Sequence, residues 1–334
     1  MIKRSPSTSK PESRKRSQTG MMWARDAMRA LLLVPMLMVV FAAAPGAVSP
    51  ALAADLSCPP ATPSTAASGA SGTAPAAATP APNAAAMTPV AFPAEGGKLT
   101  VFAAASLTDA FNKMKTDLQA EHPNLEITFQ TGGSQALVTQ LQAGAKADVL
   151  ATANNSTMKT AVDGDLIERK PVPFTGNRLV IVTPKDNPAK IASLDDLGKD
   201  GIRLVIAGAD VPAGKYALQA ICSYGSKGAA PADFVTSVGN NVVSEETDVR
   251  SVLAKVQLGE ADAGIVYASD AVAAKLSGSE VNAIEFPATV PATATYPIAP
   301  VAGGNTGLAN AFIAYVLSPD GQKVLAEYGF KSAP

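Results

Sequence analysis

In the last two-thirds of the chain, short β-rich apolar runs alternate with segments whose apolar residues recur at helical spacing. Residues 98–104 form a short β-rich run, and apolar residues then recur at helical spacing from Leu107 to Leu118. The same analysis predicts further strands at 125–129, 148–151, 178–182, 203–207 and 263–267, and helices at 137–145, 216–221, 249–258, 306–317 and 319–328. Alternating strands and helices over about 235 residues predict α/β layers arranged in two lobes rather than one.

The N-terminal part has a different pattern. Basic residues up to Arg29 precede an apolar run, and small residues follow it up to Ala54. This order predicts a signal peptide over residues 1–54, cleaved near Ala53 or Ala54. An uncleaved membrane anchor is one alternative, because the apolar run extended to Val48 just reaches spanning length. A lipid anchor on Cys58 after cleavage is another, although Asp55 stands where a lipobox has an apolar residue.

Residues 55–97 are rich in Ala, Pro, Ser and Thr. Such a segment buries too little surface to offset its ordering entropy, which predicts a flexible tether before a folded domain that begins near Gly97. The chain has two cysteines, Cys58 and Cys222. In an exported protein they either pair or remain free thiols, and sequence alone leaves both readings open.

Charge is unevenly distributed. The chain has a formal net charge of −1. Residues 1–29 contain eight Lys and Arg against Glu12 and Asp26, so this segment carries about +6 and the remainder about −7. An acidic body without clustered cations excludes nucleic acid as a partner. It does not exclude small anions, which backbone N–H groups and hydroxyls can bind.

Four junctions between a strand and a helix, or just before a helix, combine small residues, hydroxyls and glycine. They are Ala103-Ala104-Ala105-Ser106-Leu107-Thr108, Thr131-Gly132-Gly133-Ser134, Val211-Pro212-Ala213-Gly214 and Glu246-Thr247-Asp248-Val249. Each helix start presents free N–H groups at the positive end of a helix dipole. At the last junction Thr247 is the expected helix cap. Together the junctions predict an anion site at the carboxyl edge of the sheets.

Each of these residues also has an ordinary structural reading. Ser106 and Ser134 are residues that commonly cap helices, and Gly132 and Gly133 are typical of a turn. Tyr267, at the end of an apolar strand, is typical of a core residue. The combination of four such junctions in two lobes favours a site made of neutral donors.

Several sequence blocks resemble one family. They are FAAASLTDAF (102–111), GGSQALVTQLQAGAKADVLATAN (132–154), NRLVIVTPKDNP (177–188), DVPAGKYALQA (210–220), SEETDVRSVLAKVQLGEADAGIVYASDA (244–271) and the ending YGF (328–330). In this order they are similar to the periplasmic molybdate-binding proteins of ABC importers. The resemblance covers essentially all of residues 98–334.

The resemblance implies a set of ligand-binding residues. In that family serine hydroxyls, main-chain amides and a tyrosine hydroxyl hold the oxyanion. The matching positions are Ser106, Ser134, Ala213, Val249 and Tyr267. The second block has Gly-Gly-Ser where several relatives have consecutive serines, so Ser134 is its only serine. A contact from the amide of Gln135 stays open.

The resemblance also implies a fold and a function. The fold is the two-lobed type II periplasmic-binding fold, with lobe 1 at 98–180 and 270–334, lobe 2 at 181–269, and crossovers near Val182 and Tyr267. The chain is then an exported monomer, periplasmic or at the cell surface. It captures molybdate or tungstate by hinge closure and delivers it to the ABC permease in the membrane. It is a binding protein and not an enzyme, with no cofactor and no metal cation ligand.

Two alternatives remain. Another oxyanion such as sulfate has the same shape and acceptor-only oxygens, whereas phosphate keeps a proton that calls for an acceptor in the site. An enzyme on the same two-lobed fold needs a base in the cleft. The only histidine, His122, lies beside Pro123 in an expected surface loop, so the candidate bases are Asp248 and Glu246. No nucleotide, zinc-protease or hydrolase motif is present.

Overall fold

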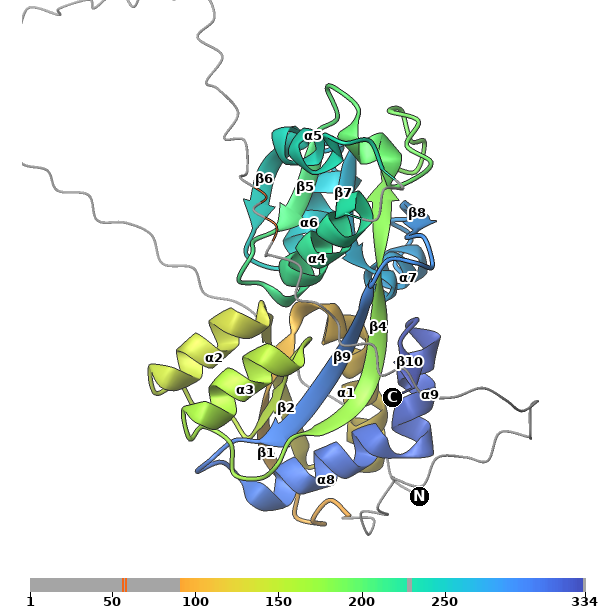
Figure 1. Ribbon diagram of the computed structural model, residues 1–334. Helices are drawn as coiled ribbons and strands as arrows, with labels where there is room; N and C mark the ends of the chain where they lie inside the picture. Colours follow the sequence, from red (N-terminus) through yellow and green to blue (C-terminus); the bar gives the residue numbers. More distant parts are fainter. Residues whose placement is uncertain (1–55, 57, 59–90, 227–229, 333–334) are drawn as a thin grey trace, which may run out of the picture. The chain divides into compact units, whose positions relative to one another are not determined.

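The computed structural model describes Leu56, Cys58 and residues 91–226 and 230–332 (Figure 1). The predicted signal peptide over residues 1–54 lies outside the described residues, as does most of the predicted tether. In the part of the chain that is described, no helix is both long and apolar enough to cross a membrane.

Strands and helices alternate through the described residues. The strands are β1 (Gly97–Ala104), β2 (Leu125–Gly132), β3 (Val149–Ala151), β4 (Val172–Thr183), β5 (Leu204–Ala207), β6 (Val242–Glu246), β7 (Ala263–Tyr267), β8 (Asn282–Glu285), β9 (Thr293–Pro300) and β10 (Lys331–Ser332). The helices are α1 (Thr108–Glu121), α2 (Ser134–Gln142), α3 (Asn155–Asp163), α4 (Pro212–Ser226), α5 (Phe234–Asn241), α6 (Val249–Gln257), α7 (Ala268–Leu276), α8 (Thr306–Leu317) and α9 (Pro319–Glu327). Short 3-10 helices span Ala105–Leu107 and Asp195–Gly198.

Strand pairing runs along the path β2-β1-β3-β9-β4-β7-β5-β6, and β8 and β10 also pair with β4. The long strand β4 divides this path into two halves (Figure 1). Its residues 172–178 pair with β9, and its residues 179–183 pair with β7 and β8. We call the part with β1, β2, β3, β9 and β10 the first half, and the part with β5, β6, β7 and β8 the second half.

The parallel pairs place the predicted junctions at strand ends. β1 pairs in parallel with β2 and β3, and β5 pairs in parallel with β6 and β7. The carboxyl ends of parallel strands share one edge, so the loops after β1 and β2 lie together, as do those after β5 and β6. Strand β8 is still paired with the second half, so the chain returns to the first half after Glu285, later than the crossover expected near Tyr267.

Most predicted elements occur where the sequence places them. Strand β7 and helix α8 have the predicted bounds, and α6 ends one residue before the predicted end. Gly259 follows α6 with a φ of 71°, the left-handed conformation expected of a glycine after a helix. The prediction that Thr247 caps α6 is wrong: Asp248 is the N-cap, and its carboxylate accepts the N–H groups of Arg250 and Ser251.

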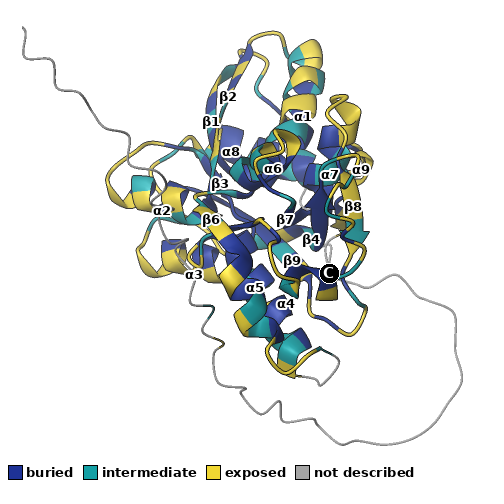
Figure 2. Cartoon of the chain, turned by 90° about the horizontal axis from the view of Figure 1, so that it is seen from above, coloured by how far each residue is buried: buried dark blue, intermediate teal, exposed yellow. Residues whose placement is uncertain are grey.

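The core lies between the central strands and the helices that cover them. Figure 2 shows β4 and β7 in dark blue beneath helices whose outer faces are exposed. All five residues of β7 and the last five of β4 are buried, because both faces of these strands are covered. One cluster of buried side chains, which includes Val101 of the first half and Val205 of the second, continues through both halves.

Three residues of the predicted tether are attached to the folded part. Phe92 is buried in the core, with its ring centroid 5.2 Å from that of His122. Leu56 is half-buried against the same core. Cys58 forms a disulfide with Cys222 of α4, which settles the pairing that the sequence leaves open. Because its sulfur is in this disulfide, Cys58 is not available for the lipid considered as an alternative anchor.

Candidate functional site

One pocket brings together all four predicted junctions. About 210 Å³ of space, part of it open to solvent, lies between its lining residues. Its lining includes all five residues predicted to bind the ligand, which are Ser106, Ser134, Ala213, Val249 and Tyr267. The first half contributes the two serines and the second half the other three residues. All five are at most 4% exposed.

Ser106 lies in the short 3-10 helix that follows β1, and it does not cap a helix. Its hydroxyl is 2.9 Å from that of Tyr296, on β9. The Tyr296 hydroxyl also accepts a longer bond, of 3.4 Å, from the side-chain amide of Asn177. With Asn177 as donor, Tyr296 can in turn donate to Ser106, and the Ser106 hydrogen is then free to point to a ligand.

Ser134 is the first residue of α2, and Gly133 is the N-cap. The Ser134 hydroxyl oxygen accepts the backbone N–H of Ala153 at 3.0 Å. A hydroxyl whose oxygen already accepts a protein donor keeps its own hydrogen for another acceptor. Ser134 therefore offers the pocket a donor whose position is fixed by the backbone after β3.

Ala213 and Val249 lie at helix starts in the second half. Ala213 is the second residue of α4, and Val249 is the first residue of α6. First-turn N–H groups have no partner within a helix and lie at the positive end of its dipole. At α6 the Asp248 carboxylate accepts the N–H groups of Arg250 at 2.8 Å and Ser251 at 3.1 Å. This leaves the N–H of Val249 for a ligand.

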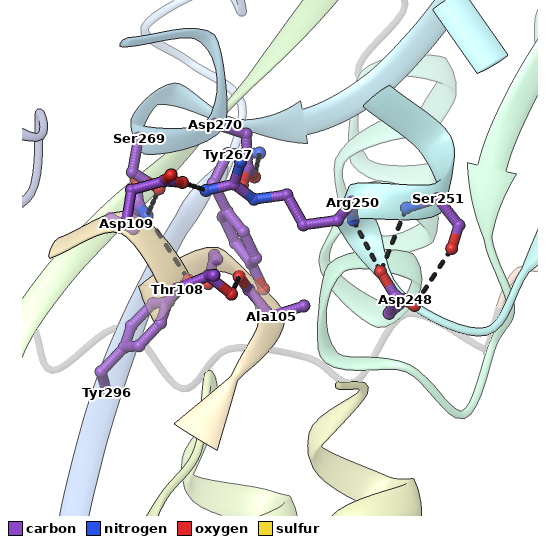
Figure 3. Close-up of polar contacts among 12 residues, drawn as sticks. Ala105, Thr108, Asp109, Asp248, Arg250, Ser251, Tyr267, Ser269, Asp270 and Tyr296 are labelled. Atoms are coloured by element: carbon purple, nitrogen blue, oxygen red, sulfur yellow. Dashed lines mark hydrogen bonds and ion pairs between the residues drawn. The ribbon is translucent and has the colours of Figure 1, made fainter. Parts of the chain in front are cut away.

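The Tyr267 hydroxyl is a buried donor without a well-formed hydrogen bond. It is inaccessible to solvent and makes no well-aligned hydrogen bond with a described residue, although the Tyr296 hydroxyl lies close enough to interact with it. Its ring centroid is 5.7 Å from that of Tyr296 (Figure 3). Burial raises the pKa of Tyr267 well above its usual value, so the hydroxyl stays protonated at neutral pH. An unpaired buried hydroxyl destabilises a protein by about 1–3 kcal/mol, so it calls for a ligand.

The candidate bases of the enzyme alternative are both engaged in structural contacts. The Asp248 carboxylate lines the pocket but accepts the hydroxyl and N–H of Ser251 and so is turned to α6. Glu246 pairs with the ammonium of Lys255 at 2.6 Å. His122 is the C-cap residue of α1 and does not line this pocket.

Three charged residues beside the pocket are not recognised from the sequence. The guanidinium of Arg250 donates to Asp109 and lies 2.9 Å from the Asp270 carboxylate (Figure 3). Asp270 also accepts the N–H of Tyr267 at 3.0 Å. Arg250 is adjacent in sequence to Val249, but its positive charge is paired with the carboxylates of Asp109 and Asp270. Apart from Asp248, whose carboxylate is turned to α6, the polar groups of the pocket lining are neutral donors.

Comparison with known proteins identifies the family. The sequence pattern of bacterial extracellular solute-binding proteins matches residues 99–331. The chain is 36% identical over 240 residues to the molybdate-binding protein ModA of Mycobacterium tuberculosis H37Rv, covering 71% of this chain and 86% of that protein. It is also 36% identical over 249 residues to ModA of Escherichia coli K12, covering 71% and 90%.

A solved structure agrees with this fold. The substrate-binding domain of a putative molybdenum ABC transporter from Clostridium difficile is 27% identical, with a TM-score of 0.52, and the match covers 71% of this chain and 99% of that one. The predicted α/β fold of the type II periplasmic-binding class is therefore confirmed. The chain belongs to the bacterial extracellular solute-binding protein family.

Proposed function

We propose that this chain binds molybdate, or the near-identical tungstate, in the pocket between its two halves and delivers it to an ABC importer. The names of the two ModA relatives support molybdate as the ligand. The pocket supports an oxyanion independently of those names, because its polar groups are donors that the protein does not use itself.

One observation carries the proposal: the pocket combines unused donors of three kinds. Ser134 keeps its hydroxyl hydrogen, because its oxygen accepts the N–H of Ala153. Val249 keeps its amide, because Asp248 serves the next two residues. The Tyr267 hydroxyl is buried without a well-aligned hydrogen bond to a described residue. A fully deprotonated tetrahedral anion has only acceptors, so it can satisfy all of these groups at once.

The same donors argue against phosphate. Phosphate carries a proton near neutral pH and needs an acceptor, and the one carboxylate in the pocket lining, that of Asp248, is turned to α6. Sulfate is the closer competitor, because it too is an acceptor-only dianion and differs from molybdate mainly in size.

The proposal includes transport rather than catalysis. The ligand leaves unchanged, and the halves open to release it to the permease. The lobe boundary near residue 180, the monomeric state and the absence of a cofactor are parts of this proposal. Export is also part of it. The disulfide of Cys58 supports export, because such bonds persist in oxidising compartments.

Isothermal titration calorimetry of the purified mature chain with four anions tests the proposal. We expect molybdate and tungstate to bind at least about a hundredfold more tightly than sulfate, and phosphate not to bind measurably. Tighter binding of phosphate than of molybdate, or equal binding of sulfate and molybdate, would overturn the assignment. Absence of binding by all four anions would overturn the anion site itself.

A further inference from the structure

The residues Thr247–Arg250, which we call the closing segment, belong to the second half but contact the first half on both flanks. On one flank the side-chain amide of Gln135, in α2, donates to the carbonyl oxygen of Thr247 at 3.1 Å. Gly133 lies beside the same carbonyl, where a Cβ atom at position 133 would be 2.4 Å from the oxygen. The closing segment is therefore packed tightly against the start of α2.

On the other flank the contact is ionic. The guanidinium of Arg250 donates to Asp109, in α1 of the first half, and pairs with Asp270, in α7. The side chains of Arg250 and Asp109 are 27% and 38% exposed, whereas that of Asp270 is fully buried. One guanidinium thus connects two elements that follow the second half's strands to a helix of the first half (Figure 3).

We call Arg250, Asp109 and Asp270 the triad. In the sequence, each member lies within three residues of a residue of the proposed site. Asp109 lies three residues after Ser106, and Arg250 directly follows Val249. Asp270 lies three residues after Tyr267 and accepts its backbone N–H. Movement of Arg250 away from its two carboxylates would therefore separate three of the donor-bearing segments from one another.

The buried carboxylate of this triad is unfavourable for stability. Burial raises the pKa of Asp270 to about 6 despite the opposing attraction of Arg250 and the bond from Tyr267, and the negative charges of Asp109 and Asp248 add to the rise. The surrounding groups therefore do not fully offset the cost of burying the negative charge of Asp270 at neutral pH. A buried charge that lowers stability is consistent with a role in geometry rather than in holding the fold together.

We propose that Arg250 is a positioning residue that holds the closing segment over the bound anion by pairing with Asp109 across the two halves. This inference rests on the proposed function. Because the Arg250–Asp109 pair joins the halves, it stabilises the closed form and not the open one. The fraction of closed protein sets the apparent affinity, so loss of the pair weakens binding without removing any donor from the site.

The variant Asp109→Asn tests this inference with the mature chain and molybdate as the probe. We expect the dissociation constant to rise about twofold to fivefold, the size of effect that a partly exposed ion pair can give. The increase should appear in the dissociation rate, measured by chasing labelled molybdate with excess unlabelled molybdate. The melting temperature of the ligand-free protein should stay close to wild type, because the open form lacks the pair.

Lys255→Gln is the matched control. Lys255 lies on the same helix and pairs with Glu246, but both residues belong to the second half. We expect this variant to bind molybdate as the wild type does. We also expect Arg250→Gln to weaken binding more than Asp109→Asn, and the double variant to bind no more weakly than Arg250→Gln alone, because both changes break one contact.

The outcomes separate this inference from the proposed function. Wild-type binding with unchanged kinetics in Asp109→Asn overturns the inference alone. Tighter binding by Asp109→Asn also overturns it, since Asp109 would then act only as a charge that repels the anion. Additive losses in the double variant overturn it as well. Absence of molybdate binding by the wild type overturns the proposed function and the inference together.

Discussion

The two halves of the molecule supply the pocket with different kinds of donor. The first half contributes the side-chain hydroxyls of Ser106 and Ser134, each held by a hydrogen bond to the first half itself. The second half contributes the backbone amides of Ala213 and Val249 at helix starts, and the hydroxyl of Tyr267. Hydroxyls thus come from both halves, whereas the helix-start amides come only from the second half.

This difference affects how each half can be altered. A hydroxyl donor is removed by a single conservative substitution, but its direction depends on partners such as Tyr296. An amide donor survives almost any substitution, because the helix start fixes its direction. Only proline removes it, or a shift of the whole helix. The predictions below use this contrast, from the largest expected effect to the smallest.

The largest effect is expected on the stability of the second half. The disulfide between Cys58 and Cys222 holds α4, the helix that carries Ala213, and spans 164 residues of sequence. The double variant Cys58→Ser/Cys222→Ser should lose about 3–5 kcal/mol of unfolding free energy, since a long closed loop restricts the unfolded chain. Chemical denaturation measures this loss. An unchanged midpoint would show that α4 is held by packing alone.

The next effect concerns the amide donors of the second half. Val249→Pro should remove the N–H and keep α6, because proline is favoured at the first position of a helix and Asp248 has the extended backbone that precedes proline. Molybdate affinity should fall by about 1.5–3 kcal/mol, the value of a hydrogen bond to a charged acceptor. Calorimetry measures it, with Val249→Ala as the control that keeps the amide. Equal binding by both variants would remove Val249 from the site.

The hydroxyl donors of the first half should show a smaller effect. Ser106→Ala should weaken molybdate binding by about 1–2 kcal/mol, because the neighbouring donors remain in place. Tyr296→Phe separates direct from indirect effects, since it leaves the Ser106 hydroxyl but removes its partner, and it should weaken binding less. Wild-type affinity in Ser106→Ala would mean that this serine serves only the contact with Tyr296.

The smallest effect concerns Tyr267. Since its buried hydroxyl makes no well-aligned hydrogen bond in the protein, Tyr267→Phe should not lower the melting temperature of the ligand-free chain and should raise it slightly. The rise in melting temperature on addition of molybdate should shrink by the equivalent of about 1 kcal/mol. A pair of thermal melts decides this. If the ligand-free melting point falls and the rise stays wild type, Tyr267 belongs to the core.

Local pattern was sufficient to predict much of the fold. Strand β7 and helix α8 match their predicted bounds, because an apolar run and a helical apolar repeat are properties of neighbouring residues. Strand β9 was not predicted. Its sequence TATYPIAP contains two prolines, which argue against a strand, and it becomes one only through pairing with β3 and β4.

The candidate site, like the fold, could be predicted only where the signal lies in neighbouring residues. The junctions after strands could be predicted because parallel strands bring their carboxyl ends to one edge. The partners of those junctions could not, since Tyr296 lies 190 residues from Ser106, and Asp109 lies 141 residues from Arg250. The Cys58–Cys222 bond was undecidable for the same reason. The sequence held one signal for the triad: each of its charged residues follows a predicted ligand-binding residue by three positions or fewer.

The central claim is that donors from both halves converge on one oxyanion. Crystals of the mature chain grown with molybdate, measured at the molybdenum absorption edge, test it most directly. The account predicts one anomalous peak in the pocket, with oxygens within hydrogen-bonding distance, about 2.7–3.2 Å, of Ser106, Ser134, Ala213, Val249 and Tyr267. A peak at another place, or a pocket that stays empty at saturating molybdate, would contradict it.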